Sequence, residues 1–301
     1  MSRRIALMGL GQMGRPIARH LAAKGEGADT VVAIDSDPAR VAGLDGPGLI
    51  ATTDREAAAG ADVLILCLPD GDVVEAVLLG PDGLAARLAP GALVIDLSTI
   101  AHATAVSLGR ALADRGLRFL DAPVSGAPAG AEAATLTVMC GGTPEDFAAA
   151  EPLLARIGTQ VLHMGPLGSG QLTKTVNNVI YDINIAALAE VLPMAVAMGL
   201  DPARLATVVT TGTSRSYASQ YFVPRILQGA FDEGYPLAKA YKDLVSAAAV
   251  GAEGGFPLPV TAAATATYQM ALRHGHGARD KGAMILPFEA MLGVAVRTPP
   301  E

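Results

Sequence analysis

The N-terminal residues combine a short apolar run, a glycine-rich loop and an amphipathic segment, in that order. Residues 4–8 predict a buried strand and residues 15–24 predict a helix. The loop that joins them consists of Gly9, Leu10, Gly11, Gln12, Met13 and Gly14. Its first glycine permits a tight turn, its second lets the backbone approach a pyrophosphate, and its third allows close packing of helix on strand. With the positive end of the helix beside it, this loop predicts a dinucleotide-binding unit.

The second predicted strand, residues 30–34, ends at Asp35. A carboxylate about 20 residues after the glycine loop is suited to bind a ribose 2′-hydroxyl. Asp37 adds a second carboxylate, and the next basic residue is Arg40. Because like charge disfavours a 2′-phosphate at this place, we expect NAD rather than NADP as the cofactor.

Strands and helices alternate through the first half of the chain. Further strands are predicted at 62–68, 92–97, 118–120, 135–139 and 159–162, and helices at 54–59, 73–79, 101–115 and 144–155. This alternation predicts an α/β fold, a Rossmann-type doubly wound parallel sheet with helices on both faces. Only helices are predicted after Gly168, at 172–198, 203–211, 216–227, 237–252, 260–273 and 282–292. We therefore expect a dinucleotide-binding domain over 1–166 and an all-helical substrate and oligomerisation domain over 167–301.

Composition narrows the class of protein. The 301 residues are 51% hydrophobic with a net charge of −7, and the absence of a lysine or arginine cluster argues against nucleic acid. Nothing at the N-terminus resembles a signal peptide, and no uninterrupted apolar run reaches the roughly 18 residues of a membrane span. We expect a cytoplasmic protein without a membrane partner. Cys67 and Cys140 lie in apolar runs, which favours buried thiols over a disulfide or metal site.

Three segments follow predicted strands at the edge where such sheets bind ligands. Leu68 and Pro69 end one strand, and proline directs the chain out of the sheet toward the cofactor. Ser98 or Thr99 ends the next, and either can cap the following helix or contact the ribose. Ser125 and Gly126 offer a hydroxyl and an unhindered N–H, suited to an anion but equally compatible with a surface turn.

The segment from Gly168 to Asn178 is the strongest indication of chemistry. It begins as a glycine-rich loop and continues as a helix in which Gln171, Lys174 and Asn178 share one face. A solvated polar stripe would explain a lone lysine. Together with the preceding motifs, Lys174 is predicted to be a proton donor and acceptor. Partial burial and a cationic neighbour such as Lys242 would lower the pKa of such a lysine toward the working pH.

These motifs, in this order, resemble those of the β-hydroxyacid dehydrogenase family, which includes 3-hydroxyisobutyrate dehydrogenase and tartronate semialdehyde reductase. The similarity covers the fingerprint at 9–14, the segment 121–126, the segment 168–178 and the segment 242–244. The resemblance implies that Lys174 transfers the proton and that Ser125, Gly126 and Asn178 hold the substrate. It also implies that Thr99 and Lys242 lie against the cofactor, and that Tyr235 and Asp243 close the far side of the pocket.

The chain departs from the family pattern at two places. Ala127 and Ala134 stand where the family usually carries glycine, and both changes narrow the conformational freedom of the loop.

None of the histidines accompanies a carboxylate in a motif that would orient it, and no metal-binding constellation is visible. The histidines are His20, His102, His163, His274 and His276.

The sequence therefore predicts an NAD-dependent enzyme that acts on a small 3-hydroxy acid or semialdehyde carrying a carboxylate. Other reductases on this fold are the alternatives, but imine reductases lack the lysine and phosphogluconate-type enzymes carry a longer helical domain. A non-catalytic nucleotide-binding regulator would not need Ser125, Lys174 and Asn178 together. The helix at 172–198 is apolar on several sides, so we also expect a homodimer or homotetramer joined through the C-terminal helices.

Overall fold

The computed structural model describes residues 3–25 and 29–298. It divides into two compact units, Met1–Lys174 and Thr175–Glu301, which we describe one at a time. The boundary expected from the sequence, between residues 166 and 167, lies just before the long helix that continues from the first unit into the second. That boundary stays a prediction.

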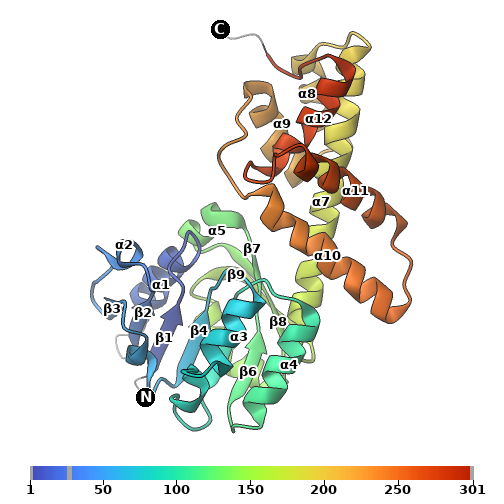
Figure 1. Ribbon diagram of the computed structural model, residues 1–301. Helices are drawn as coiled ribbons and strands as arrows, with labels where there is room; N and C mark the ends of the chain where they lie inside the picture. Colours follow the sequence, from blue (N-terminus) through green and yellow to red (C-terminus); the bar gives the residue numbers. More distant parts are fainter. Residues whose placement is uncertain (1–2, 26–28, 299–301) are drawn as a thin grey trace. The chain divides into compact units, whose positions relative to one another are not determined.

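The first unit is built on a nine-stranded sheet (Figure 1). Its strands are β1 (Arg4–Met8), β2 (Thr30–Ile34), β3 (Leu49–Thr52), β4 (Val63–Leu66), β5 (Leu93–Asp96), β6 (Arg118–Asp121), β7 (Val124–Ser125), β8 (Leu136–Gly141) and β9 (Gly158–Gly165). They lie in the order β3-β2-β1-β4-β5-β6-β8-β7, with β9 beside β8. Because the order reverses direction between β1 and β4, the crevice at their carboxyl ends is the expected ligand site.

The pairing from β3 to β6 is parallel, as the alternation predicts. One edge of the sheet departs from the parallel pairing, because β8 runs antiparallel to β6 and β7. A parallel return needs a crossover of a dozen or more residues, usually a helix. Between β7 and β8 the chain forms only the seven-residue helix α5 (Ala127–Ala133), so β8 returns beside β7 in the opposite direction.

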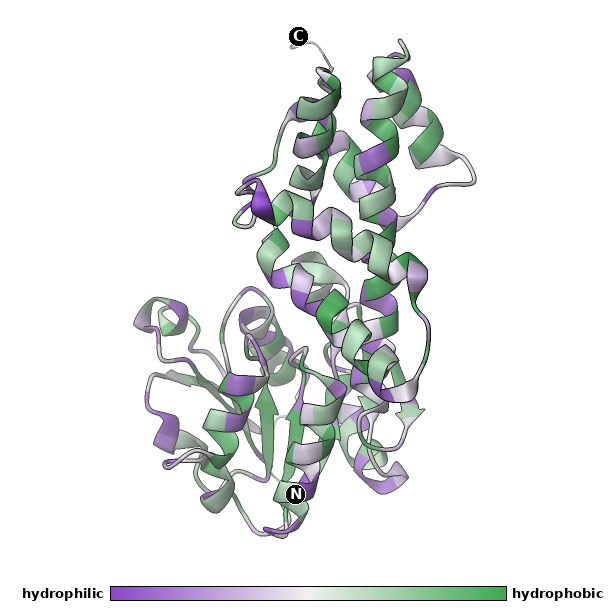
Figure 2. Ribbon diagram, turned by 45° about the vertical axis from the view of Figure 1, so that its right-hand side comes forward, coloured by the Kyte–Doolittle hydropathy of each residue, from purple (hydrophilic) through white to green (hydrophobic). Residues whose placement is uncertain are grey.

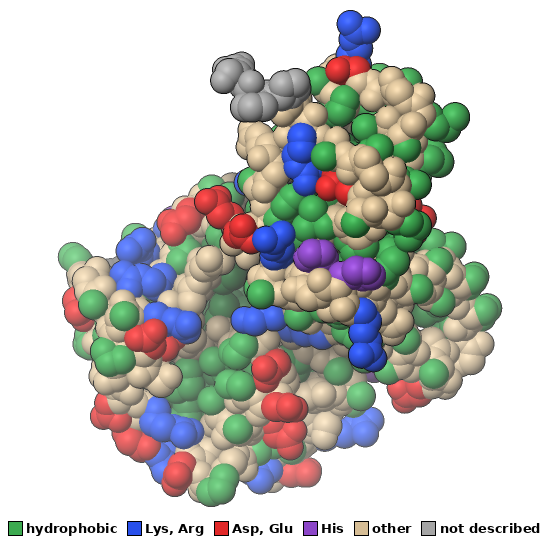
Figure 3. Space-filling model, turned by 45° about the horizontal axis from the view of Figure 1, so that its top comes forward, with side chains coloured by type: hydrophobic (Ala, Val, Ile, Leu, Met, Phe, Trp, Pro, Cys, Tyr) green, Lys and Arg blue, Asp and Glu red, His purple; other side chains and the backbone are tan. Residues whose placement is uncertain are grey.

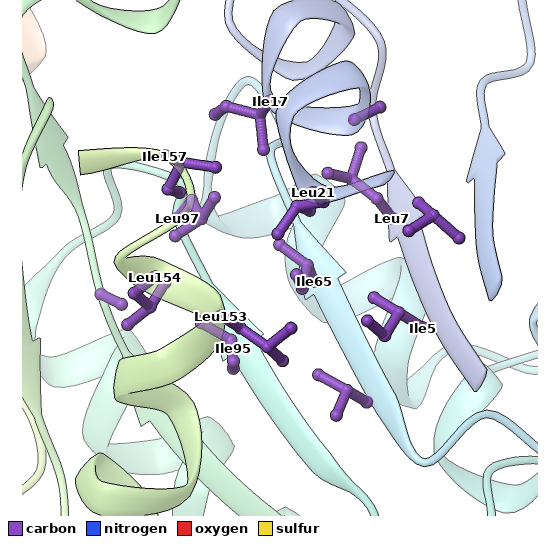
Figure 4. Close-up of a cluster of buried hydrophobic side chains, with 14 of the residues drawn as sticks. Ile5, Leu7, Ile17, Leu21, Ile65, Ile95, Leu97, Leu153, Leu154 and Ile157 are labelled. Carbon is purple, nitrogen blue, oxygen red and sulfur yellow. The ribbon is translucent and has the colours of Figure 1, made fainter. Parts of the chain in front are cut away.

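Helices cover both faces of the sheet. They are α1 (Gly14–Ala23), α2 (Pro38–Val41), α3 (Gly71–Leu79), α4 (His102–Ala113), α5 and α6 (Pro144–Leu154), with 3₁₀ turns η1 (Arg55–Ala58) and η2 (Leu84–Ala86). Successive residues of a strand point to opposite faces. Ile5 and Leu7 therefore join α1 and α6 in one buried cluster (Figure 4), while Ala6 and Met8 join α3 and α4 in another.

Most elements of this unit match the sequence prediction, and β1 and β2 have the predicted bounds. The helix expected at 54–59 is instead the 3₁₀ turn η1. Five short elements, β3, β7, α2, α5 and η2, were not predicted. They have two to seven residues each, too few for a repeating hydrophobic pattern to be recognised.

The second unit is helical. Its elements are α7 (Ser169–Ala197, whose first residues belong to the first unit), α8 (Pro202–Thr211), α9 (Tyr217–Gln228), α10 (Leu237–Gly254), α11 (Pro259–Arg273), η3 (Lys281–Met284) and α12 (Ile285–Leu292). Apolar residues such as Phe222, Leu244, Tyr268 and Ile285 form its core. Hydrophobic and polar segments alternate along these helices, whereas the sheet strands are mainly hydrophobic (Figure 2).

Helix α7 is long and apolar enough to cross a membrane by length and composition, and among the described residues it is the single helix of this kind. This is weak evidence, since the core helix of a soluble protein passes the same test. Asp182 interrupts its apolar sequence and is fully buried within the protein. On the face drawn in Figure 3, basic and acidic side chains are interspersed. The expectations of no membrane and no nucleic acid remain predictions.

Candidate active site

The glycine loop between β1 and α1 has a different geometry at each of its three glycines. Gly9 has a φ of +100°, and a Cβ there would lie 2.2 Å from the Cys67 carbonyl oxygen. A Cβ at Gly14 would lie 1.8 Å from the Gly9 carbonyl oxygen. At Gly11 nothing lies within 4 Å of the corresponding position. The turn and the packing therefore require two of the glycines, and the third leaves the backbone open to a ligand.

The first turn of α1 is suited to an anion. The residue before the helix, Met13, makes no side-chain cap, and the first turn contains no acidic residue. The Arg15 N–H donates to the Gly11 carbonyl oxygen at 3.2 Å and Pro16 has no N–H, so this turn offers a phosphate chiefly the positive end of the helix dipole. Gln12 is exposed on the same loop. These observations fit the pyrophosphate of a dinucleotide.

Asp35 lies at the carboxyl end of β2 and is 7% exposed. One carboxylate oxygen accepts a hydrogen bond from the Leu10 backbone N–H at 2.7 Å, and the other accepts from the Asp37 N–H at 2.9 Å. The structure also pairs Arg40 with both carboxylates, at 3.4 Å from Asp35 and 3.5 Å from Asp37. The glycine loop thus orients a carboxylate at the position where a ribose would bind, with one arginine beside it.

Two further predicted segments are joined at the carboxyl ends of β4 and β5. The Leu68 N–H donates to the Ser98 hydroxyl at 2.9 Å, and Ser98 is buried. Ser98 therefore supports the loop after β4, while its neighbour Thr99 is half-buried and Pro69 is exposed. Of the two candidates for this position, Ser98 is the structural residue, and Thr99 is left as the candidate for cofactor contact.

The segment predicted to hold the substrate has a left-handed backbone. Ser125 ends β7 and is partly exposed, and Gly126 has a φ of +139°. Ala127 and Ala134, at the two ends of α5, have φ of 56° and 51°. Within residues 3–25 and 29–298 they are the two non-glycine residues with positive φ. The departures from the family pattern thus fall where an L-residue is strained.

Two buried carboxylates lie side by side where β5 and β6 end. Asp96 and Asp121 are register partners, and both are fully buried. Burial raises the pKa of Asp96 to about 7, with the charge of Asp121 adding to the increase and hydrogen bonds from Ser98 opposing it. Burial also raises the pKa of Asp121, against hydrogen bonds from the backbone of Gly168 and Gln171. These donors belong to the loop and helix that contain Lys174, so α7 begins at the carboxyl edge of the sheet.

Lys174 itself is half-buried, five residues into α7. Gln171, expected on the same face, is 1% exposed and turns toward the loop after β5. Gln171 is therefore a structural contact of the first unit, and the polar face of the helix begins with Lys174.

The second unit brings together two of its predicted site residues. The side-chain amide of Asn178 donates to the carboxylate of Asp243 at 2.8 Å, which joins α7 to α10. Tyr235 is half-exposed, and partial burial together with the charge of Asp243 raises the pKa of its hydroxyl to about 12. Its hydroxyl therefore stays protonated at neutral pH and can donate a hydrogen bond. Lys242 is half-buried one residue before Asp243.

One buried cluster of the second unit was not predicted. Asp182, one turn after Asn178, accepts hydrogen bonds from the Lys281 ammonium at 2.5 Å and the Tyr268 hydroxyl at 2.8 Å. The Lys281 ammonium also lies 4.1 Å from the centre of the Tyr181 ring. An aspartate within an apolar helix indicates a buried partner, but the sequence does not say which residue that partner is.

His20 and His163 make structural contacts. His20 and His163 each hydrogen-bond a backbone carbonyl, of Glu132 and Gly142, and the His163 ring stacks on Phe147. In the described part of the chain, no group of three or more His, Cys, Asp or Glu side chains is arranged to hold a metal ion.

Comparison with known proteins agrees with this geometry. A family model described as the NAD binding domain of 6-phosphogluconate dehydrogenase matches residues 4–165. A second, described as NAD-binding of NADP-dependent 3-hydroxyisobutyrate dehydrogenase, matches residues 168–288. Together the two models cover both halves of the chain.

Relatives of similar length match as well. The chain is 36% identical over 295 residues to 2-(hydroxymethyl)glutarate dehydrogenase of Eubacterium barkeri, which covers 97% of each chain. It is 42% identical over 221 residues to 3-hydroxyisobutyrate dehydrogenase of Pseudomonas aeruginosa, which covers 73% of each. The crystal structure of 3-hydroxyisobutyrate dehydrogenase from Salmonella typhimurium superposes with a TM-score of 0.86 at 28% identity, covering 95% of this chain and 100% of that one. The chain therefore belongs to the β-hydroxyacid dehydrogenase family and is an oxidoreductase with a nicotinamide dinucleotide-binding domain.

Proposed function

We propose that the protein catalyses the reversible oxidation of a small 3-hydroxy acid to its semialdehyde, with NAD as the cofactor and Lys174 as the general base. One observation carries this proposal. The helix that contains Lys174 begins at the Asp121 carboxylate, at the same edge of the sheet as the glycine loop after β1. A lysine on the first turns of that helix is therefore close to the crevice where the dinucleotide fits.

The bound nicotinamide supplies hydride transfer, and the protein has to supply the proton transfer. In the oxidative direction Lys174 removes the proton of the substrate hydroxyl as the carbonyl forms, and in the reductive direction it returns that proton to the alkoxide oxygen. Ser125, Gly126 and Asn178 hold the substrate carboxylate and oxygen. Asp243 supports this role of Asn178, because it fixes one end of the amide.

The substrate class rests on the relatives. Those reported above are named for 2-(hydroxymethyl)glutarate and 3-hydroxyisobutyrate, both small hydroxy acids with a carboxylate. We infer that this chain acts on a molecule of the same kind. An imine reductase, a phosphogluconate-type enzyme and a non-catalytic regulator are less favoured, since full-length relatives at 36% identity are hydroxyacid dehydrogenases by name.

NAD is the proposed cofactor because Asp35 and Asp37 together outweigh the single positive charge of Arg40. A 2′-phosphate would therefore meet a net negative surface. The opposing consideration is that one matching family model is named for an NADP-dependent enzyme.

The assembly is proposed to be a homodimer or homotetramer, and the compartment the cytoplasm. Several apolar residues of α7 are exposed in the single chain, including Ile180, Val191 and Met194. A second copy of the chain would bury this stripe.

A turnover assay tests the proposal. The purified protein is mixed with NAD and a series of small 3-hydroxy acids, and with NADH and the matching semialdehydes, and cofactor absorbance is followed. We expect turnover with at least one carboxylate-bearing pair. Cofactor binding without turnover of any compound in the series would contradict the enzyme proposal and favour the regulator.

A further inference from the structure

The first turn of α7 is held by the carboxylate of Asp121, a side chain from β6. One oxygen accepts from the Gly168 N–H at 2.7 Å, and the other accepts from the Gln171 N–H at 2.8 Å. Asp121 is fully buried, so neither bond competes with water. A helix is usually capped by a residue of its own chain segment, but here a distant strand provides the acceptor and also fixes where the helix begins.

Close backbone packing fixes the same turn from a second side. A Cβ at Gly170 would lie 2.3 Å from the Met139 carbonyl oxygen and 2.7 Å from that of Asp121. A Cβ at Gly141 would lie 2.5 Å from the Asp121 carboxylate and 2.7 Å from the Ser169 nitrogen. Neither position has room for a side chain. The first turn of α7 therefore rests directly on the backbone of β6 and β8.

The Gln171 side chain connects this turn to the loop after β5. Its amide nitrogen donates to the Ser98 carbonyl at 2.8 Å, and its amide oxygen accepts from the Ile100 N–H at 3.1 Å. These two bonds bracket Thr99, the candidate for cofactor contact. Since Ser98 also accepts from the Leu68 N–H, the buried Gln171 side chain links the helix to two loops at the carboxyl edge of the sheet.

We propose that Gln171 and Asp121 are positioning residues for Lys174, and that Gln171 fixes the lysine and the 98–100 segment relative to each other. Lys174 is three residues after Gln171 on the same helix, so the backbone that carries it is set by the turn that Asp121 and Gln171 hold. A catalytic group has to be held within about 0.5 Å of its productive position. This inference rests on the proposed function of Lys174 and adds the residues through which the lysine is placed.

The test is the substitution Gln171→Met, which keeps the length of the side chain and removes both hydrogen bonds. We expect kcat to fall about 10- to 100-fold, because a displacement near 1 Å can cost 10²-fold in rate. The KM for NAD should also rise, since the 98–100 segment loses its anchor. Gln160→Met, on the exposed part of β9, is the matched control and should leave both constants unchanged.

The same substitution in a Lys174→Ala background separates positioning from a general structural effect. If Gln171 acts through Lys174, the double variant has the kcat of Lys174→Ala alone, while its KM for NAD is still raised. If kcat of the double variant instead falls by the product of the two single-variant losses, Gln171 acts independently of the lysine and the proposal is overturned. Asp121→Asn is measured in both backgrounds and should show the same dependence on Lys174.

Two outcomes distinguish this proposal from the proposed function. If Lys174→Ala keeps normal turnover, the proposed role of Lys174 as general base fails. If Lys174→Ala loses turnover but Gln171→Met and Asp121→Asn change kcat less than about twofold, the positioning proposal alone fails. Should Gln171→Met not fold, Gln171→Glu takes its place, since it keeps the acceptor for Ile100 and loses only the donor to Ser98.

Discussion

At the scale of single residues, Ala134 shows how the chain accepts strain beside its candidate site. It follows α5 with φ 51° and ψ 44°, a left-handed conformation that costs an L-residue roughly 1–2 kcal/mol. Glycine at this position removes that cost and is the usual residue after a helix. Ala134 follows α5, and Ser125 and Gly126, predicted to hold the substrate, precede the same helix.

We predict that Ala134→Gly raises the free energy of unfolding by up to about 1 kcal/mol, because the relieved strain exceeds the extra entropy of glycine in the unfolded chain. Urea denaturation followed by circular dichroism measures it. Ala129→Gly, at an exposed position inside α5, is the matched control and should destabilise by about 0.5–1 kcal/mol. Equal destabilisation by both substitutions would show that Ala134 is unstrained.

We expect three charged side chains at the end of β2 to decide the choice between NAD and NADP. We predict that kcat/KM with NAD exceeds that with NADP by about tenfold or more, because Asp35 and Asp37 repel a 2′-phosphate. Asp35→Ser should narrow the ratio, and Arg40→Ser should widen it, since Arg40 lies beside both carboxylates. Steady-state kinetics with both cofactors measures the ratio. Equal efficiency with NADP in the unchanged protein would refute the preference.

At the scale of elements, the Lys281–Asp182 pair joins η3 to α7 inside the helical unit. Burial raises the pKa of Asp182, while the charge and hydrogen bond of Lys281 oppose that increase. We predict that Lys281→Met lowers the free energy of unfolding by about 3–5 kcal/mol, because it leaves a buried carboxylate without its cation. Chemical denaturation measures the loss.

The exposed Lys239→Met on α10 serves as its control and should change stability by less than about 0.5 kcal/mol. Adding Asp182→Asn to Lys281→Met should recover part of the stability, since the uncompensated charge is removed. A loss below about 1 kcal/mol in Lys281→Met would mean that the pair contributes little.

Elements whose ends carry a local sequence signal could be predicted. β1 and β2 are short apolar runs bounded by a glycine loop and by Asp35, and their ends lie where the sequence places them. Helix α7 was expected from residue 172, but it begins at Ser169 because the Asp121 carboxylate holds its first turn. Asp121 lies 47 positions from Gly168 and 50 from Gln171 in the sequence, so no local pattern indicates this contact.

The same distinction applies to the candidate site, where features with a local sequence signal could be predicted and contacts between distant segments could not. Glycine spacing predicts the open backbone at Gly11, and the end of the second predicted strand predicts the carboxylate at Asp35. Lys281 beside Asp182, and the Asp121 carboxylate beside Gln171, depend on how distant segments meet. A sequence gives the residue types of such pairs but not their partners.

At the scale of the whole molecule, the single chain leaves an apolar stripe on α7. Ile180 is 58% exposed, Val191 46% and Met194 52%, although Leu188 and Leu192 of the same helix are packed into the core. We predict that light scattering at micromolar concentration gives a mass of two or four times the 30.5 kDa chain. A mass of one chain would refute the prediction.

Substitution identifies which face is involved. Val191→Asp together with Met194→Asp should reduce the assembly to smaller species, because a carboxylate on each copy would be buried in the contact. Ile50→Asp, on the equally exposed edge strand β3, is the control and should leave the mass unchanged. If the α7 variant keeps the full mass, the contact lies elsewhere.

The measurement that tests the central claim most directly is the turnover of Lys174→Ala on the substrate identified for the unchanged protein. We predict a loss in kcat of about 10² to 10⁴-fold, with NAD binding nearly unchanged, because the substitution removes the proton transfer and leaves the glycine loop and Asp35 intact. Stopped-flow or steady-state absorbance gives kcat, and fluorescence titration gives the affinity for NAD. A Lys174→Ala protein that turns over at a near-normal rate would contradict the assignment of the proton transfer to this lysine.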